Sequence, residues 1–149
     1  MKLLDANVVI YALGVPHPYR DLCQRILRAL DSDDHDYVMD TEVLQEVLHV
    51  FDRRGQRLKG IQKVTDLLIA LREVIPVGAS EIAITLRMLG EHPRLSPRDA
   101  IHAAVVLGHG LEGIVSTDRA FDGITGLVRY DPMAMVAEGP EAIGGGQSR

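Results

Sequence analysis

Short apolar runs alternate with longer amphipathic segments along most of this chain, and that alternation strongly limits the folds it can adopt. The short runs have the length and composition of buried strands. The longer segments repeat their apolar residues at helical spacing. Strands that alternate with helices in this way form a parallel sheet covered by helices on both faces. We therefore predict an α/β fold built on one parallel sheet.

The predicted elements can be placed by residue number. We expect strands at 2–5, 37–39, 74–77 and 113–117, with 127–130 as a candidate fifth strand. We expect helices at 7–13, 19–30, 41–53, 61–73, 80–89 and 98–108. Thr41, Ser80 and Ser96 are residue types that cap helix N-termini, and Pro97 suits a first helical turn. Pro76 is compatible with a strand at an edge of the sheet.

The length of 149 residues fits a single domain, which we predict to cover residues 1–137. Residues 138–149 are rich in glycine and cannot bury a core, so we expect a disordered tail. A basic run from Arg53 to Lys59 is predicted to form a loop. That loop could steer phosphates toward a site or could simply be solvated.

Charge and cysteine content narrow the class of protein. The formal net charge of -5 gives no sign of the extended basic surface that a high-affinity DNA-binding protein needs. The single cysteine, Cys23, allows no intramolecular disulfide and favours a reducing compartment. The N-terminus lacks the apolar region of a signal peptide, and no run approaches the ~20 apolar residues of a membrane helix. We expect a cytoplasmic protein without a membrane partner.

Four carboxylates stand where a parallel α/β fold can bring them together. Asp5 and Asp118 end predicted strands, Asp99 lies in the first turn of a helix, and Glu46 lies inside an apolar helix. The carboxyl ends of parallel strands border the crevice in which such folds bind ligands. Taken from spacing alone, the same residues could also be ordinary strand-end and helix-cap groups on the surface.

Bringing the four carboxylates together requires compensation. Two carboxylates about 4 Å apart repel by about 4 kcal/mol at an effective dielectric constant of about 20. A bound cation removes that cost, and ligands that are all oxygen favour Mg²⁺ or Mn²⁺ over zinc. Such a cation lowers the pKa of a bound water and holds phosphate oxygens. The pattern therefore favours hydrolysis of a phosphodiester.

Three motifs and one isolated residue carry a resemblance to a known family. The motifs are L-L-D-A-N-V-V-I-Y-A at 3–12, R-D-A-I-H-A-A at 98–104 and I-V-S-T-D-R-A-F-D at 114–122, and the residue is Glu46. In this order and spacing they resemble the PIN-domain nucleases, and more narrowly the VapC-type toxins of bacterial and archaeal toxin–antitoxin pairs. The resemblance covers the chain to about Asp131.

The resemblance implies a PIN-like domain with strand order 3-2-1-4-5 and a Mg²⁺-dependent ribonuclease activity, for which Mn²⁺ substitutes. It implies that a metal is held by Asp5, Asp99 and Asp118. Glu46 would hold or polarise the attacking water. The implied supporting residues are Asn7, which orients the first carboxylate, Ser116, and Asp122, which could help to hold a second ion.

Further residues are open to two interpretations. Arg98 and Arg119 adjoin proposed ligands and could contact an RNA phosphate or take part in ordinary surface pairs. His102 lies one helical turn after Asp99, and we interpret it as an interior or boundary residue rather than a substrate contact. The apolar side chains between 61 and 89, with those of Met133 and Met135, are expected to be mostly core. Any that are exposed would form a groove for an antitoxin, and the resemblance also implies a homodimer.

Other functions fit the sequence less well. A haloacid-dehalogenase-type phosphatase needs a second aspartate two positions after the first, where this chain has Asn7. A response-regulator receiver needs an acidic pair near its start and a late lysine, but the Asp33-Asp34 pair is in a linker and no lysine follows Lys63. The strongest alternative is a catalytically silent PIN-like module that binds a protein. The presence of all four acidic residues favours an active enzyme.

Overall fold

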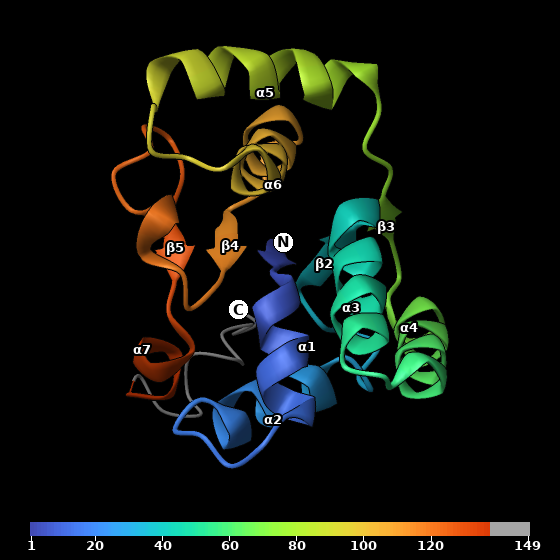
Figure 1. Cartoon of the computed structure of the whole chain (residues 1–149). Helices are drawn as coiled ribbons and strands as arrows, with labels where there is room; N and C mark the ends of the chain where they lie inside the picture. Colours follow the sequence, from blue (N-terminus) through green and yellow to red (C-terminus); the bar gives the residue numbers. More distant parts are fainter. Residues whose placement is uncertain (138–149) are drawn as a thin grey trace.

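The computed structural model describes residues 1–137 and contains a five-stranded sheet in the order β3-β2-β1-β4-β5 (Figure 1). Every neighbouring pair of strands is parallel. The strands are β1 (Lys2–Leu4), β2 (Tyr37–Asp40), β3 (Val74–Ile75), β4 (Gly113–Val115) and β5 (Arg129–Tyr130). The predicted fold class and strand order are confirmed, and the third strand lies at an edge. The tail expected to be disordered lies outside the described residues.

Seven helices and one 3-10 turn connect the strands within residues 1–137. They are α1 (Ala6–Leu13), α2 (Arg20–Ala29), α3 (Thr41–Arg53), α4 (Arg57–Ala70), α5 (Ala79–Glu91), α6 (Pro97–Gly108), η1 (Arg119–Phe121) and α7 (Pro132–Ala137). The sequence predicted six of these helices within a few residues. It gave no indication of α7, whose apolar residues follow directly on the last strand.

The two faces of the sheet bury alternate residues of the same strands. Leu4, Met39 and Val115 lie in a core cluster with residues of α1, α2, α3 and α4. Their neighbours Leu3, Val38 and Ile114 lie in a second cluster with residues of α6. All six side chains are fully buried, and burial of one aliphatic side chain contributes about 1.5–3 kcal/mol. The central strands are therefore apolar on both faces, as the sequence predicted.

Helix α5 is an outer layer that packs on α6 and lies away from the sheet (Figure 1). Thr85 and Met88 are buried, whereas Ile82 and Leu86 are exposed on the other side of the helix. The expectation that apolar side chains of this region are mostly core is therefore only partly met. Exposed apolar residues are also found on α4, namely Leu58, Ile61, Leu68 and Ile69.

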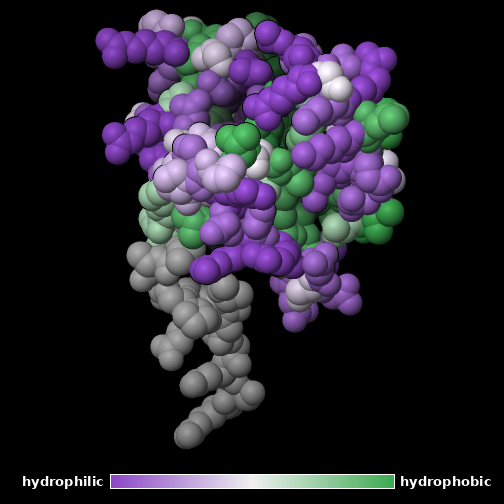
Figure 2. All heavy atoms as spheres, turned by 60° about the horizontal axis from the view of Figure 1, so that its bottom comes forward, coloured by the Kyte–Doolittle hydropathy of each residue, from purple (hydrophilic) through white to green (hydrophobic). Residues whose placement is uncertain are grey.

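A space-filling view shows apolar groups on the surface, separated by hydrophilic side chains (Figure 2). None of the helices within residues 1–137 is long and apolar enough to cross a membrane.

Two helix caps differ from the predicted ones. The N-cap of α3 is Asp40, whose Oδ1 accepts a 2.7 Å hydrogen bond from the backbone N–H of Val43, so Thr41 is the first helical residue. The N-cap of α5 is Gly78, because the Glu81 side chain reaches back to accept from the Gly78 N–H. The expected cap at Ser96 is confirmed, since its hydroxyl accepts from the N–H of Asp99.

The predicted basic loop is shorter than expected. Helix α4 begins at Arg57 and includes the basic residues that follow it, so only residues 54–56 connect α3 to α4. Gly60 allows this tight hairpin, because a Cβ at this position would lie 2.8 Å from the Cβ of Phe51. The close approach of the two helices fixes the register of α4 against α3.

Candidate functional site

The first element of the site is Asp5, which follows β1 directly and is the N-cap residue of α1. Its backbone N–H donates to the carbonyl of Val115 on β4, so the residue is still held by the central strands. The side chain is 6% exposed. The parallel sheet therefore presents a nearly buried carboxylate at the carboxyl end of its central strand.

Ser116 and Asn7 fix the orientation of that carboxylate. The Ser116 hydroxyl donates to Asp5 Oδ2 at 2.6 Å, and the Asn7 side-chain amide donates to the same oxygen at 3.0 Å. The amide also donates to the Ser116 oxygen at 3.0 Å. Ser116, one residue after β4, and Asn7, at the start of α1, are the residues that the resemblance implied as supporting, and both donate hydrogen bonds to Asp5.

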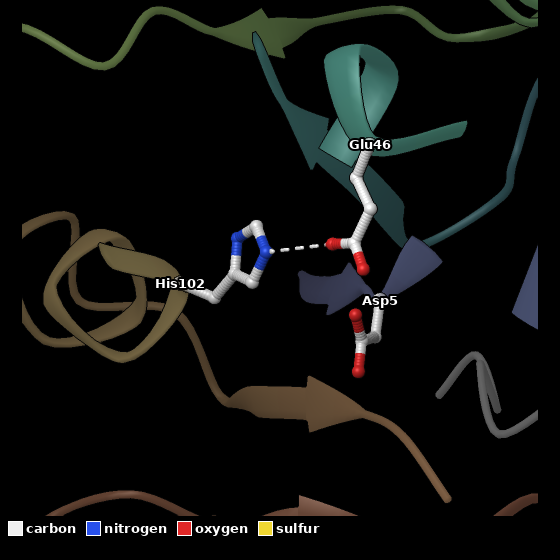
Figure 3. A group of neighbouring side chains, drawn as sticks. All are labelled: Asp5, Glu46 and His102. Carbon is white, nitrogen blue, oxygen red and sulfur yellow. Dashed lines mark ion pairs between the residues drawn. The ribbon is translucent and has the colours of Figure 1, made fainter. Parts of the chain in front are cut away.

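Glu46 approaches Asp5 from the middle of α3 (Figure 3). The helix is held at its N-terminus by Asp40, and its apolar face is buried against the sheet through Val43 and Val47. One carboxylate oxygen of Glu46, Oε1, lies 3.1 Å from the guanidinium of Arg98. Arg98 is thus paired with the neighbouring site residue in this structure.

His102 is the residue whose importance the sequence did not indicate. Its ring is 1% exposed, and Nδ1 lies 2.8 Å from Oδ2 of the fully buried Asp40. The other nitrogen, Nε2, has no hydrogen-bond partner within the described residues and lies 3.6 Å from Glu46 Oε2. His102 is buried, as the sequence predicted. Its ring, however, lies between the carboxylates of Asp40 and Glu46.

Three ligand atoms converge at this point. One atom each from Asp5, Glu46 and His102 lie within 4.8 Å of one another (Figure 3). Asp5 directly follows β1, Glu46 lies on α3 and His102 lies on α6, so the three residues are far apart in the sequence. In the sequence, only the three-residue spacing from Asp99 indicated that His102 could lie near the site. For Asp40, the only indication was that it is a polar residue at the end of a strand.

Burial and close ionisable partners act in opposite directions on the pKa values of this cluster. Burial raises the pKa of Asp5 to about 6, although His102 and the Ser116 hydroxyl act in the opposite direction. Burial alone lowers the pKa of His102, but its hydrogen bond to Asp40 and its proximity to Glu46 outweigh that effect and raise the pKa to about 10. In the absence of another cation, the imidazolium is the positive charge that balances these buried carboxylates.

The remaining predicted residues lie outside this three-residue group. Asp99 is half-buried, and its Oδ2 accepts a 2.7 Å hydrogen bond from the Ser96 hydroxyl. Asp118 is exposed and accepts from the N–H of Ala120, while its own N–H donates to the Ser116 hydroxyl. Asp118 is therefore connected to Asp5 through one hydroxyl group.

Asp122 and Arg119 are also outside the group. Both oxygens of Asp122 pair with the guanidinium of Arg129, at 2.8 and 3.2 Å. Arg119 is exposed and lines a shallow hollow together with Arg94 and His92.

Comparisons with known sequences identify the family of this chain. The family model of the PIN domain matches residues 2–127. The chain is 35% identical over 130 residues to VapC ribonuclease Mb1869c of Mycobacterium bovis, which covers 87% of this chain and 98% of that protein. The chain belongs to the PIN-domain family, in its VapC branch. The resemblance predicted from the motifs is confirmed.

Two further comparisons support the VapC assignment and the fold. Ribonuclease VapC7 of Mycobacterium tuberculosis is 32% identical over 136 residues, which is 90% of this chain and 93% of that protein. A toxin–antitoxin complex from Klebsiella pneumoniae contains a chain with a TM-score of 0.66 and 19% identity, covering 89% of this chain and 98% of the other. That similarity extends over nearly the full length of the other chain.

The donor set of this VapC-family site fits a divalent cation. Two carboxylates converge in a nearly buried position, where their repulsion is screened little by water. Both hydrogen bonds that Asp5 accepts through its side chain from described residues fall on Oδ2, so Oδ1 accepts none of them. A lone pair on a buried Nε2 faces the same space once that nitrogen is deprotonated. These are the properties expected of a metal-binding pocket.

Proposed function

We propose that this VapC-family protein is a divalent-metal-dependent endoribonuclease that hydrolyses RNA phosphodiesters. The observation that carries the proposal is the convergence of Asp5, which directly follows β1, with Glu46 of α3 at the carboxyl edge of the sheet. The names of the relatives, VapC ribonuclease Mb1869c and Ribonuclease VapC7, support the same activity. A silent binding module would have no need for a buried carboxylate held by two donors.

The proposed roles follow from the position of each side chain. Asp5, with its orientation fixed by Ser116 and Asn7, would hold the cation. Glu46, less buried than Asp5 and on the open side of the pocket, would accept a proton from the attacking water. The Arg98 guanidinium would exchange its contact with Glu46 for a contact with an RNA phosphate. The water would displace the 3′ oxygen in line at phosphorus.

Asp99 and Asp118 are proposed to complete the ligand set. Asp99 lies in the first turn of α6, one turn before His102, and Asp118 is linked to Asp5 through the Ser116 hydroxyl. Each would exchange its present hydrogen bond, to Ser96 or Ala120, for the cation. Asp122 would help to hold a second ion only after its ion pair with Arg129 has broken.

Bound Mg²⁺ or Mn²⁺ would supply charge stabilisation at phosphorus and lower the pKa of a bound water. The experiment is cleavage of a mixed RNA pool by purified protein with either ion, with and without EDTA. We expect EDTA and Asp5→Asn each to abolish cleavage. Asp33→Asn, in the exposed linker before β2, is the matched control and should remain active. Cleavage that persists in Asp5→Asn would contradict the proposal.

We also propose that this ribonuclease is the toxin of a type II toxin–antitoxin pair that acts in the cytoplasm. The structural similarity to a chain of the Klebsiella toxin–antitoxin complex supports an antitoxin partner. The exposed apolar residues of α4 offer an interaction surface for such a partner or for a second copy of the chain. Light scattering of the protein alone and with the product of the adjacent gene tests both the predicted homodimer and the complex.

A further inference from the structure

We propose that His102 is a direct ligand of the catalytic cation through Nε2, so that the site is a mixed nitrogen and oxygen site that favours Mn²⁺ over Mg²⁺. The inference deepens the proposed function, because it concerns the same pocket. It departs from the all-oxygen ligand set expected from the sequence.

The first observation is that His102 Nε2 makes no hydrogen bond. Nε2 of a ring that is 1% exposed has no hydrogen-bond partner within the described residues. In the described part of the chain, its only partner is Glu46 Oε2, an ion pair at 3.6 Å, a separation too long for a hydrogen bond (Figure 3). It is nevertheless within the separation of two atoms that bind one small cation, each about 2.1 Å from it.

The second observation is the partner of the other ring nitrogen. Nδ1 lies 2.8 Å from Oδ2 of Asp40, a carboxylate with 0% exposure that is fixed by its role as the N-cap of α3. Histidines that bind metals usually donate their second N–H to a carboxylate or carbonyl in this way. In the neutral ring that binds a metal, this hydrogen bond keeps the proton on Nδ1 and leaves the Nε2 lone pair facing Glu46 (Figure 3).

The third observation is the direction in which the ring points. His102 lies on α6, on the opposite face of the sheet from α3, and its side chain extends between the helix and Asp5. Nε2 and the carboxylate oxygens of Asp5 and Glu46 therefore border the same small volume, although the three residues lie on different segments of the chain. Coordination requires a neutral ring, so the cation takes the place of the Nε2 proton.

The ligand type determines the expected selectivity. Imidazole nitrogen suits transition metals, whereas Mg²⁺ prefers oxygen ligands and keeps several waters. A pocket with one imidazole and two or more carboxylates should therefore bind Mn²⁺ more tightly than Mg²⁺. Replacement of His102 by glutamine should remove most of that preference while leaving the carboxylates in place.

The decisive experiment uses the metal alone, without RNA. Pulsed electron paramagnetic resonance of stoichiometric Mn²⁺ bound to the wild-type protein should show hyperfine coupling to a directly bound ¹⁴N nucleus. Labelling of histidine with ¹⁵N should convert that coupling to ¹⁵N coupling, and this arm needs no substitution. Absence of nitrogen coupling in wild-type protein that binds Mn²⁺ would overturn the inference and leave the proposed ribonuclease function intact. Failure to bind Mn²⁺ at all would contradict both.

Substitutions test the assignment to this histidine. In His102→Gln the nitrogen coupling should disappear and the Mn²⁺ affinity measured by calorimetry should fall at least tenfold, with a smaller fall for Mg²⁺. His49→Gln, at an exposed position of α3, is the control and should leave both unchanged. Asp40→Asn keeps an oxygen for the α3 cap, so it should retain the coupling and weaken Mn²⁺ binding by about 10–100-fold. Coupling that persists in a folded His102→Gln protein would contradict the assignment.

Discussion

The Ser116 hydroxyl donates a 2.6 Å hydrogen bond to the Asp5 carboxylate across a sequence separation of 111 residues. The contact exists because β4 lies beside β1 in the sheet, in parallel register from Lys2 to Leu4. The same hydroxyl accepts from the N–H of Asp118 and from the Asn7 amide. One buried hydroxyl thus connects both ends of the proposed ligand set.

Replacement of Ser116 by alanine should impair both stability and activity. The variant leaves the Asp118 N–H without its partner and removes the closest donor to a buried carboxylate, which costs about 1–3 kcal/mol. Urea denaturation should show this loss in the free energy of unfolding, and RNA cleavage should fall with it. Thr125→Ala, which also removes a hydroxyl at an exposed position, is the control. A stability change in Ser116→Ala no larger than in the control would show that the network is not stabilising.

Replacement of Arg98 by alanine should strengthen metal binding and weaken RNA binding. Arg98 is 61% exposed, so loss of its ion pair with Glu46 should change stability by less than about 1 kcal/mol. Removal of a positive charge beside the pocket should lower the dissociation constant for Mn²⁺ in calorimetry without RNA. The KM for RNA should rise. Arg87→Ala, on the exposed side of α5, should change neither value.

Two glycine-to-alanine substitutions in helices should have opposite effects. A Cβ at Gly60 would meet the Cβ of Phe51 at 2.8 Å, and that atom cannot move without the α3 backbone. The overpacking should cost about 1–3 kcal/mol, which outweighs the gain of up to about 1 kcal/mol in helix propensity. At Gly90 of α5 the new Cβ would meet no described atom within 4 Å apart from the adjoining chain and the backbone of its own helix, so alanine should be stabilising. Thermal unfolding of the two variants gives the comparison.

Replacement of Glu81 by glutamine should destabilise the protein at neutral pH but not in strong acid. Hydrogen bonds from the Gly78 N–H and the Ser80 hydroxyl lower the pKa of Glu81 from 4.5 to about 2. A lowered pKa means that the stabilisation is complete above about pH 4.5 and is lost as the pH falls toward about 2. The melting temperatures of wild type and Glu81→Gln should therefore converge over this range. The exposed Glu73→Gln should show no such convergence.

The sequence predicted the sheet and most helices because their periodicities are strong and local. Val43 and Val47 on α3, or the apolar run before Asp5, identify their elements without tertiary information. The caps at Asp40 and Gly78 were missed because the neighbouring Thr41 and Ser80 are equally good cap residues in isolation. The cap of α3 is decided by where β2 ends, and the cap of α5 by the hydrogen bond from the Gly78 N–H to the Glu81 side chain.

The candidate site was predicted in part. Strand ends and family motifs named Asp5, Glu46, Asn7 and Ser116, and the structure brings these four side chains close together. Their functional roles are proposals. His102 was assigned to the interior because a histidine in an Ala-rich helix is usually a satisfied core residue. Its interaction with Asp40 spans 62 residues, and no local pattern encodes a pair at that separation. Long-range pairing between side chains is therefore what the sequence alone could not supply.

The central position of β1 has a consequence for synthesis of the protein. The strand supplies Asp5 at the start of the chain, but its neighbour β4 and the Ser116 hydroxyl are made more than a hundred residues later. A nascent chain on the ribosome cannot assemble the pocket until β4 has emerged from the exit tunnel. For the ribonuclease proposed above, the message that encodes the chain therefore meets an assembled pocket only after β4 has been made.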